Sequence, residues 1–107
     1  GHPSGVECIT ITRRMPFNLG NAVKYIWRAG SKGDTLDDLR KAEFYLDDFL
    51  RSATDFTRSP VERTMIYRVI GYESDEHRVN IFEAIADGYI IDALDLLRKW
   101  IEVVSGE

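Results

Sequence analysis

The sequence predicts an all-α fold of about five helices, with an antiparallel helical hairpin at the N-terminus and further helices after it. Apolar residues recur three and four positions apart over most of the chain, as they do along one face of an α-helix. Gly, Pro, Ser and Asp residues interrupt this pattern at the points where helices would begin and end. Together these observations favour helices joined by short loops.

The chain of 107 residues has the length of a single domain, which we divide into a hairpin (1–51), a linker (52–58) and a helical C-terminal part (59–107). No apolar run approaches the roughly 20 residues that a membrane span needs. The single cysteine, Cys8, excludes an intrachain disulfide and fits a reducing cytosol.

Charge is distributed unevenly along the chain. The formal net charge is −4, yet residues 1–32 hold five Lys or Arg residues and one acidic residue. An acidic protein with a basic N-terminal segment is not expected to bind long nucleic acid non-specifically. The distribution favours a local site for a small anion.

Residues 6–14 are compatible with two structures. Residues 9–12 alternate and are β-branched, as in a strand, whereas Val6, Ile9 and Arg13 have the spacing of a short helix. We favour the helix, because an isolated strand would have no partner.

Residues 17–30 predict one helix with two distinct faces. Gly30 suits the left-handed conformation that ends many helices. The polar face has no carboxylate, although solvated faces usually mix both signs of charge. The apolar face comprises Leu19, Ala22, Val23, Ile26 and Trp27, and the polar face comprises Asn21, Lys24, Tyr25 and Arg28.

The second helix of the hairpin is expected over residues 35–51, with Thr35 as its N-cap. A polar stripe on this helix contains Asp38, Lys41 and Tyr45. The loop before it is short, so the two helices should pack antiparallel.

Three further helices are predicted in the C-terminal part, over residues 59–70, 74–86 and 89–104. Ser59 and Glu62 form a capping-box pattern at the first of them. The last helix is apolar over more than one face, which is typical of a central helix or a subunit contact. We therefore expect a homo-oligomer.

The strongest candidate site is the polar face of the first hairpin helix, with Lys32 just beyond its end. Lys and Arg side chains suit phosphate groups, and Asn21 adds directional donors. The competing interpretation is an ordinary solvated basic face. The sequence contains no P-loop, dinucleotide-binding, zinc or EF-hand motif.

Two further candidates are weaker. Asp38 could serve as a base or metal ligand beside a phosphate contact from Lys41, or the two could form a surface ion pair. His2 could act as a general acid–base or contact a base edge, or be incidental. Tyr25 and Tyr45 could stack on a base or belong to the core.

Residues 2–7, 17–32 and 38–46 together resemble a phage-encoded family catalogued as domain of unknown function 3310 and often labelled "nucleotide kinase". The label comes from a phage kinase of deoxynucleoside monophosphates that lacks a P-loop. The resemblance covers about residues 2–51. The motif positions of the family fall on His2, Asn21, Lys24, Tyr25, Arg28, Lys32, Asp38, Lys41 and Tyr45.

The resemblance implies a phage-type nucleotide-binding protein of the bacterial host cytosol. In a kinase, Lys24, Arg28 and Lys32 would bind phosphates, while Asp38 and His2 would be the catalytic residues. No cofactor follows from the motifs themselves; a kinase would use ATP as phosphate donor, accompanied by Mg²⁺.

Two alternative functions belong to other classes. A phage sponge would sequester a cyclic or linear nucleotide immune signal in the same basic pocket without chemistry. A helical interaction module would instead bind a host protein through the last helix.

Overall fold

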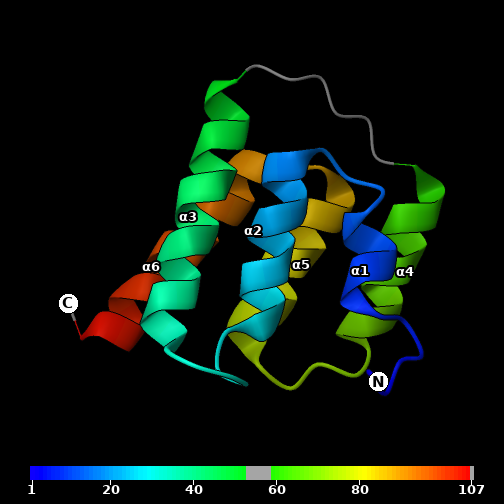
Figure 1. The fold of residues 1–107 in the computed structure, drawn as a ribbon, viewed down its shortest axis with the longest axis horizontal. Coiled ribbons are helices and arrows are strands. Elements are labelled where there is room, and N and C mark those ends of the chain that lie inside the picture. The colour runs from blue at the N-terminus through cyan, green and yellow to red at the C-terminus, as the bar shows by residue number, and fades with distance from the viewer. Residues whose placement is uncertain (53–58, 107) are drawn as a thin grey trace.

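The computed structural model describes residues 1–52 and 59–106, and this part of the chain forms six α-helices and no strand (Figure 1). The predicted all-α class is confirmed. Residues 53–58, most of the predicted linker, and residue 107 lie outside the described residues. The helices are α1 (Cys8–Thr12), α2 (Phe17–Arg28), α3 (Thr35–Arg51), α4 (Pro60–Ile70), α5 (Glu76–Asp87) and α6 (Ile90–Ser105).

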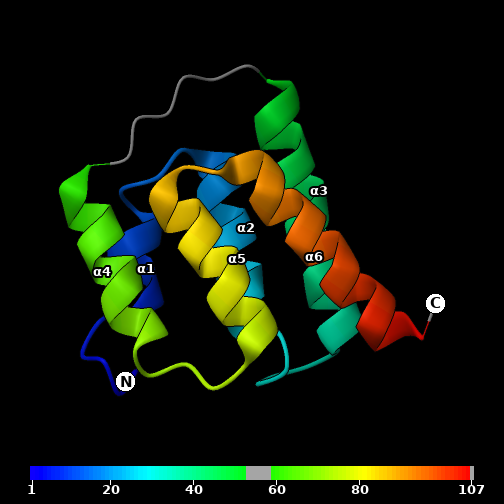
Figure 2. The same cartoon turned by 180° about the vertical axis from the view of Figure 1, so that it is seen from behind.

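Helices α2 and α3 lie side by side and antiparallel, as the sequence predicts (Figure 1). Helices α5 and α6 form a second pair behind them (Figure 2). The apolar faces of both pairs meet in a shared core, because α6 packs on α3 and α5 packs on α2. Fully buried side chains of this core include Leu19, Ile26, Leu39, Leu46, Ile81, Ile85 and Leu97.

The ambiguous N-terminal segment is helical. Helix α1 is short and packs between α2 and α4. It buries Ile11, while Ile9 remains exposed. One buried side chain per turn is enough to dock this helix, so the β-branched residues do not need a strand partner.

Of the two helix N-termini predicted from the sequence, one is confirmed and one is wrong. Ser59 N–H donates to Glu62 Oε2 at 2.9 Å, so the predicted capping box of α4 is confirmed. Asp75 caps α5 by accepting from the backbone N–H of His77. The predicted N-cap of α3, Thr35, is wrong: Asp34 accepts from the Asp37 N–H, and Thr35 is the first helical residue.

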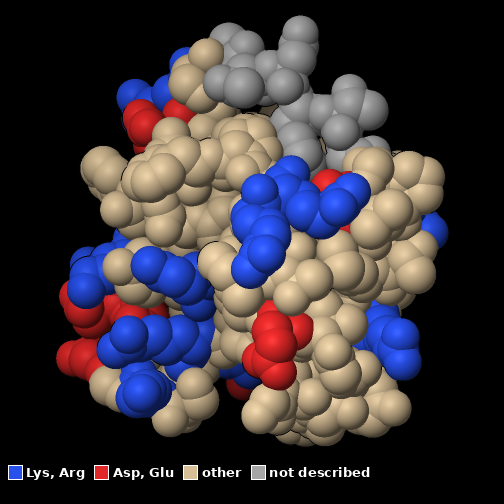
Figure 3. Space-filling model, turned by 45° about the vertical axis from the view of Figure 1, so that its right-hand side comes forward, with Lys and Arg blue, Asp and Glu red and all other residues tan. Residues whose placement is uncertain are grey.

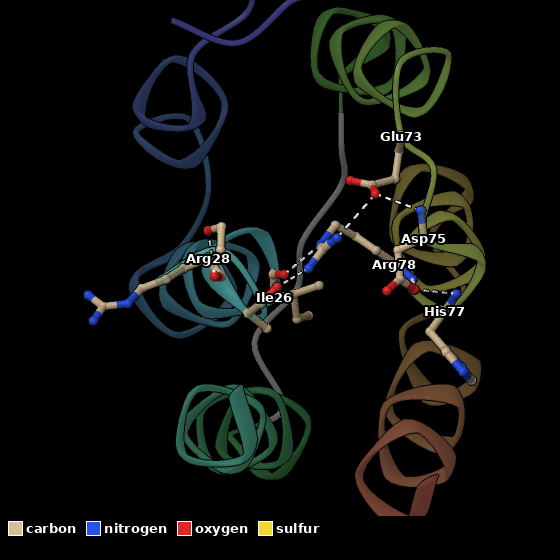
Figure 4. Close-up of polar contacts among 8 residues, drawn as sticks. Ile26, Arg28, Glu73, Asp75, His77 and Arg78 are labelled. Atoms are coloured by element: carbon tan, nitrogen blue, oxygen red, sulfur yellow. Dashed lines mark hydrogen bonds and ion pairs between the residues drawn. The ribbon is translucent and has the colours of Figure 1, made fainter. Parts of the chain in front are cut away.

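Arg78 links the N-terminal end of α5 to the C-terminal end of α2 through hydrogen bonds (Figure 4). Its Nε donates to Ile26 O at 2.9 Å, its Nη2 donates to Ala29 O, and its Nη1 pairs with Glu73 Oε2 at 3.1 Å. The side chain is only 11% exposed. Because the last carbonyls of a helix lack intrahelical partners, Arg78 satisfies groups that would otherwise be buried unpaired.

Helix α6 is apolar on more than one side, as predicted. Trp100 and Leu97 lie in the core, whereas Ile91 and Val103 are exposed. Within the described ranges, none of the helices has the length and hydrophobicity to cross a membrane. The homo-oligomer stays a prediction.

We predict that Arg78→Met lowers the free energy of unfolding by about 3 kcal/mol, because it leaves the carbonyls of Ile26 and Ala29 without this donor and the Glu73 carboxylate without its charged partner. Urea unfolding followed by circular dichroism measures this change. The control is Arg68→Met, on the exposed side of α4, which should stay within about 0.5 kcal/mol of the parent protein. Equal stability of the two variants would contradict the role given to Arg78.

Candidate functional site

The polar sides of α2 and α3 form one continuous surface, which we call the hairpin face. It contains Lys24, Tyr25 and Arg28 of α2 and Lys41 and Tyr45 of α3. The rings of Tyr25 and Tyr45 are stacked, with centroids 6.0 Å apart and planes at 4°. Basic side chains gather at the lower left in Figure 3, over this hairpin, with acidic side chains at their edge.

Two lysines approach the same tyrosine ring from different helices. Lys24 Nζ lies 4.6 Å and Lys41 Nζ lies 5.5 Å from the centroid of Tyr25. Both contacts are within the range of cation–π attraction, so one ring is shared by a lysine from each helix of the hairpin. The ring of Tyr25 is therefore the organising element of the hairpin face.

The two lysines differ in how their charge is balanced. Lys41 pairs with Asp37 Oδ2 at 3.0 Å, and this hydrogen bond raises the pKa of Lys41. Lys24 forms no ion pair with any described residue. Its positive charge is available to an external anion.

Arg28 is held by a buried carboxylate at the end of the hairpin face. Asp38 is 3% exposed, and its Oδ2 lies 3.4 Å from Arg28 Nε. This Oδ2 accepts no hydrogen bond from the described part of the chain. The Arg28 side chain is 50% exposed, and Figure 4 shows its guanidinium pointing away from Arg78 on the other side of α2. Asp38 is thus placed to orient Arg28.

The turn between α2 and α3 leaves little room beside Arg28. Gly33 has φ +70°, and a Cβ placed there would lie 3.2 Å from Arg28 Nη2. A glycine suits this position for both reasons, since other residues are strained at positive φ. The turn therefore contributes to the position of the guanidinium.

The remaining predicted residues of the hairpin either make no polar contact or pair differently than expected. Asn21 is half-buried and Lys32 is exposed, and neither side chain has a hydrogen bond or ion pair within the described ranges. The pair of Asp38 and Lys41 that spacing allowed does not form, because Lys41 pairs with Asp37 and Asp38 with Arg28. Sequence spacing could not distinguish these partners.

His2 lies apart from the other predicted site residues. Its ring packs edge-on against Trp27, with centroids 5.1 Å apart, and its Nδ1 is 2.7 Å from Ser4 Oγ. Trp27 is half-buried and packs against the core. No described contact links His2 to the cations of the hairpin face.

Two exposed aromatic residues extend the hairpin face and were missed by the sequence analysis. Phe17 is 77% exposed and Phe44 is 67% exposed. Both rings stand nearly perpendicular to Tyr45, with centroids 6.2 Å and 5.4 Å from it. In the sequence, both could have been recognised as aromatic residues that lie outside the apolar stripe of their helix. The hairpin face thus has an aromatic end at Phe17 and a cationic end at Arg28.

No group of three or more His, Cys, Asp or Glu side chains is arranged to hold a metal ion in residues 1–52 and 59–106.

In α1, burial raises the pKa of the Cys8 thiol to about 11, although the Lys24 ammonium acts in the opposite direction.

Residues 2–47 match the model of a family described as a protein of unknown function, DUF3310. The match covers less than half of the chain and includes all of α2 and the predicted site residues up to Tyr45. No curated protein and no solved structure matches the chain.

We predict that Cys8 reacts with iodoacetamide at pH 8 roughly 100-fold more slowly in the folded protein than in urea, because its raised pKa leaves little reactive thiolate. The rate should keep rising with pH beyond about 10, where an ordinary thiol is mostly ionised. The chain has one cysteine, so mass spectrometry of the single adduct measures both rates. Equal rates in the two states would contradict the burial of the thiol.

Proposed function

We propose that the hairpin face binds the phosphate groups of a nucleotide. The observation that carries this proposal is the convergence of Lys24 and Lys41, from two helices, on the ring of Tyr25. Both ammonium groups lie beside the same ring and can donate to a phosphate there, Lys24 without an ion-pair partner among the described residues and Lys41 beside Asp37. Family similarity over residues 2–47 coincides with this surface but does not itself name a ligand.

Arg28 supplies a second type of phosphate contact. Its Nε faces Asp38, so both terminal nitrogens of the half-exposed guanidinium remain for an external anion. A guanidinium fork can contact two phosphate oxygens at once. Lys32 follows in the adjacent turn and adds a charge without an ion-pair partner in the described residues. These groups support binding of more than one phosphate oxygen at this end.

The aromatic end of the hairpin face suits the base. Phe17 and Phe44 present exposed rings around Tyr45, and bases stack on such rings without strong sequence preference. A bound nucleotide would then lie along α2, with its base near Phe17 and its phosphates near Arg28. Asn21 lies between these ends and would contact the sugar.

A kinase is the second candidate function, because the family resemblance implies one and a buried carboxylate lies beside the phosphate-binding cations. In this role Asp38 would accept a proton from the attacking group, with ATP and Mg²⁺ supplied from solution. Arg28 covers Asp38, however, and a base must reach the proton that it removes. The geometry therefore supports nucleotide binding more directly than phosphoryl transfer.

The first test is binding of dTMP and ATP measured by calorimetry. We expect Lys24→Ala and Arg28→Ala each to weaken affinity by about tenfold or more, the usual effect of losing a charge-assisted hydrogen bond. Matched controls are Lys99→Ala on α6 and Arg68→Ala on α4, both exposed and without ion pairs to described residues. If the parent protein binds neither nucleotide, or if all four variants bind equally, the hairpin face is not the site.

The second test separates binding from transfer. We expect a deoxynucleoside monophosphate incubated with ATP, with and without Mg²⁺, to be recovered unchanged by chromatography, because Asp38 is shielded by Arg28. A diphosphate product that disappears in Asp38→Asn would instead assign phosphoryl transfer to this site. The Asp38→Asn variant keeps the side-chain shape, so its unfolding transition serves as the control for correct folding.

A further inference from the structure

A cavity of about 380 Å³ opens beside the C-terminal end of α2. It is bounded by the end of α2, the loop between α4 and α5, and the first turns of α5. This volume lies in the range of small-molecule sites. Figure 4 shows that the Arg28 guanidinium points away from this region, so the cavity is separate from the cations of the hairpin face.

One wall of the cavity is aromatic. Trp27 and Phe82 pack with ring centroids 5.9 Å apart, and His2 stands edge-on to Trp27. Ala29 and Val69 add apolar surface. Such a wall can hold a planar group, and the face of an indole attracts positive charge.

Two carboxylates line the cavity, and each has one oxygen that accepts no hydrogen bond from the described residues. Glu73 uses Oε2 to accept from the Asp75 N–H at 2.8 Å and from Arg78 at 3.1 Å. Asp75 uses Oδ1 to cap α5. No described residue donates a hydrogen bond to Glu73 Oε1 or Asp75 Oδ2. Both oxygens are acceptors that a ligand could use.

The charge of the cavity is negative once its internal contacts are counted. Arg78 also lines it, but the guanidinium is already bound to Ile26 O, Ala29 O and Glu73. Two carboxylates face one arginine, and the hydroxyls of Ser31 and Ser74 can accept further hydrogen bonds. An anion would meet the unpaired carboxylate charge, whereas a donor-rich cation would complement it.

We propose that this cavity binds a small organic cation with a planar, donor-rich head group such as guanidinium. The head group donates to the spare oxygens of Glu73 and Asp75 and lies against Trp27. The site is independent of the proposed nucleotide site, because it uses other residues and the opposite charge.

The test compares arginine and agmatine with citrulline, which has the shape of arginine but an uncharged side chain. Binding is followed by calorimetry and by the shift of the Trp27 indole signal in NMR spectra. We expect arginine and agmatine to bind at millimolar or lower concentration and citrulline to bind at least about tenfold more weakly, as expected for hydrogen bonds that lose their charge.

Isosteric variants locate the site. Asp75→Asn keeps an oxygen to cap α5, and Glu73→Gln keeps an oxygen for Arg78, but each removes a negative charge. Each should weaken arginine binding by about tenfold, while Asp95→Asn and Glu102→Gln on exposed positions of α6 should not. Equal binding of arginine and citrulline, no binding of either, or full affinity in both cavity variants would overturn the proposal. If one cavity variant does not fold, the other decides.

Discussion

The contact on which the rest of the structure depends is that of Arg78 with the end of α2. A helix C-terminus leaves carbonyls without partners, and Ile26 and Ala29 at the end of α2 are buried. The Arg78 guanidinium of α5 donates hydrogen bonds to the carbonyls of Ile26 and Ala29 and forms an ion pair with Glu73. Its side chain also lies over the ring of Trp100 of α6, so that a single residue links α2, α5 and α6.

Helix α2 therefore borders both the cationic surface of the hairpin and the cavity lined by carboxylates. On one side, Lys24 and Arg28 give α2 a cationic surface together with α3. At its C-terminal end, Trp27 faces a cavity that carries spare carboxylate oxygens. Trp27 and Arg28, which are adjacent in sequence, therefore face surroundings of opposite charge, because successive positions of a helix point about 100° apart.

Sequence periodicity was sufficient for most of the helices and for the polar face of α2, but it left the polar stripe of α3 as a separate candidate. The structure shows that Lys24 and Tyr25 share a surface with Lys41 and Tyr45, because the apolar sides of the two antiparallel helices face the core. Partners that depend on rotamers or on distant segments were not predictable. Arg78 reaches a carbonyl 52 positions earlier in the chain, and Lys41 pairs with Asp37 while Asp38 is buried beside Arg28. His2 packs against Trp27 because of the path of the first turn, which no periodic pattern describes.

The segment similar to the DUF3310 family ends at residue 47, and Arg78 lies well beyond it. The hairpin in this protein is therefore completed by a donor that the matched segment does not contain. The C-terminal part of this chain therefore helps to determine how firmly the matched segment is held, since without Arg78 the carbonyls of Ile26 and Ala29 would need another donor or access to water.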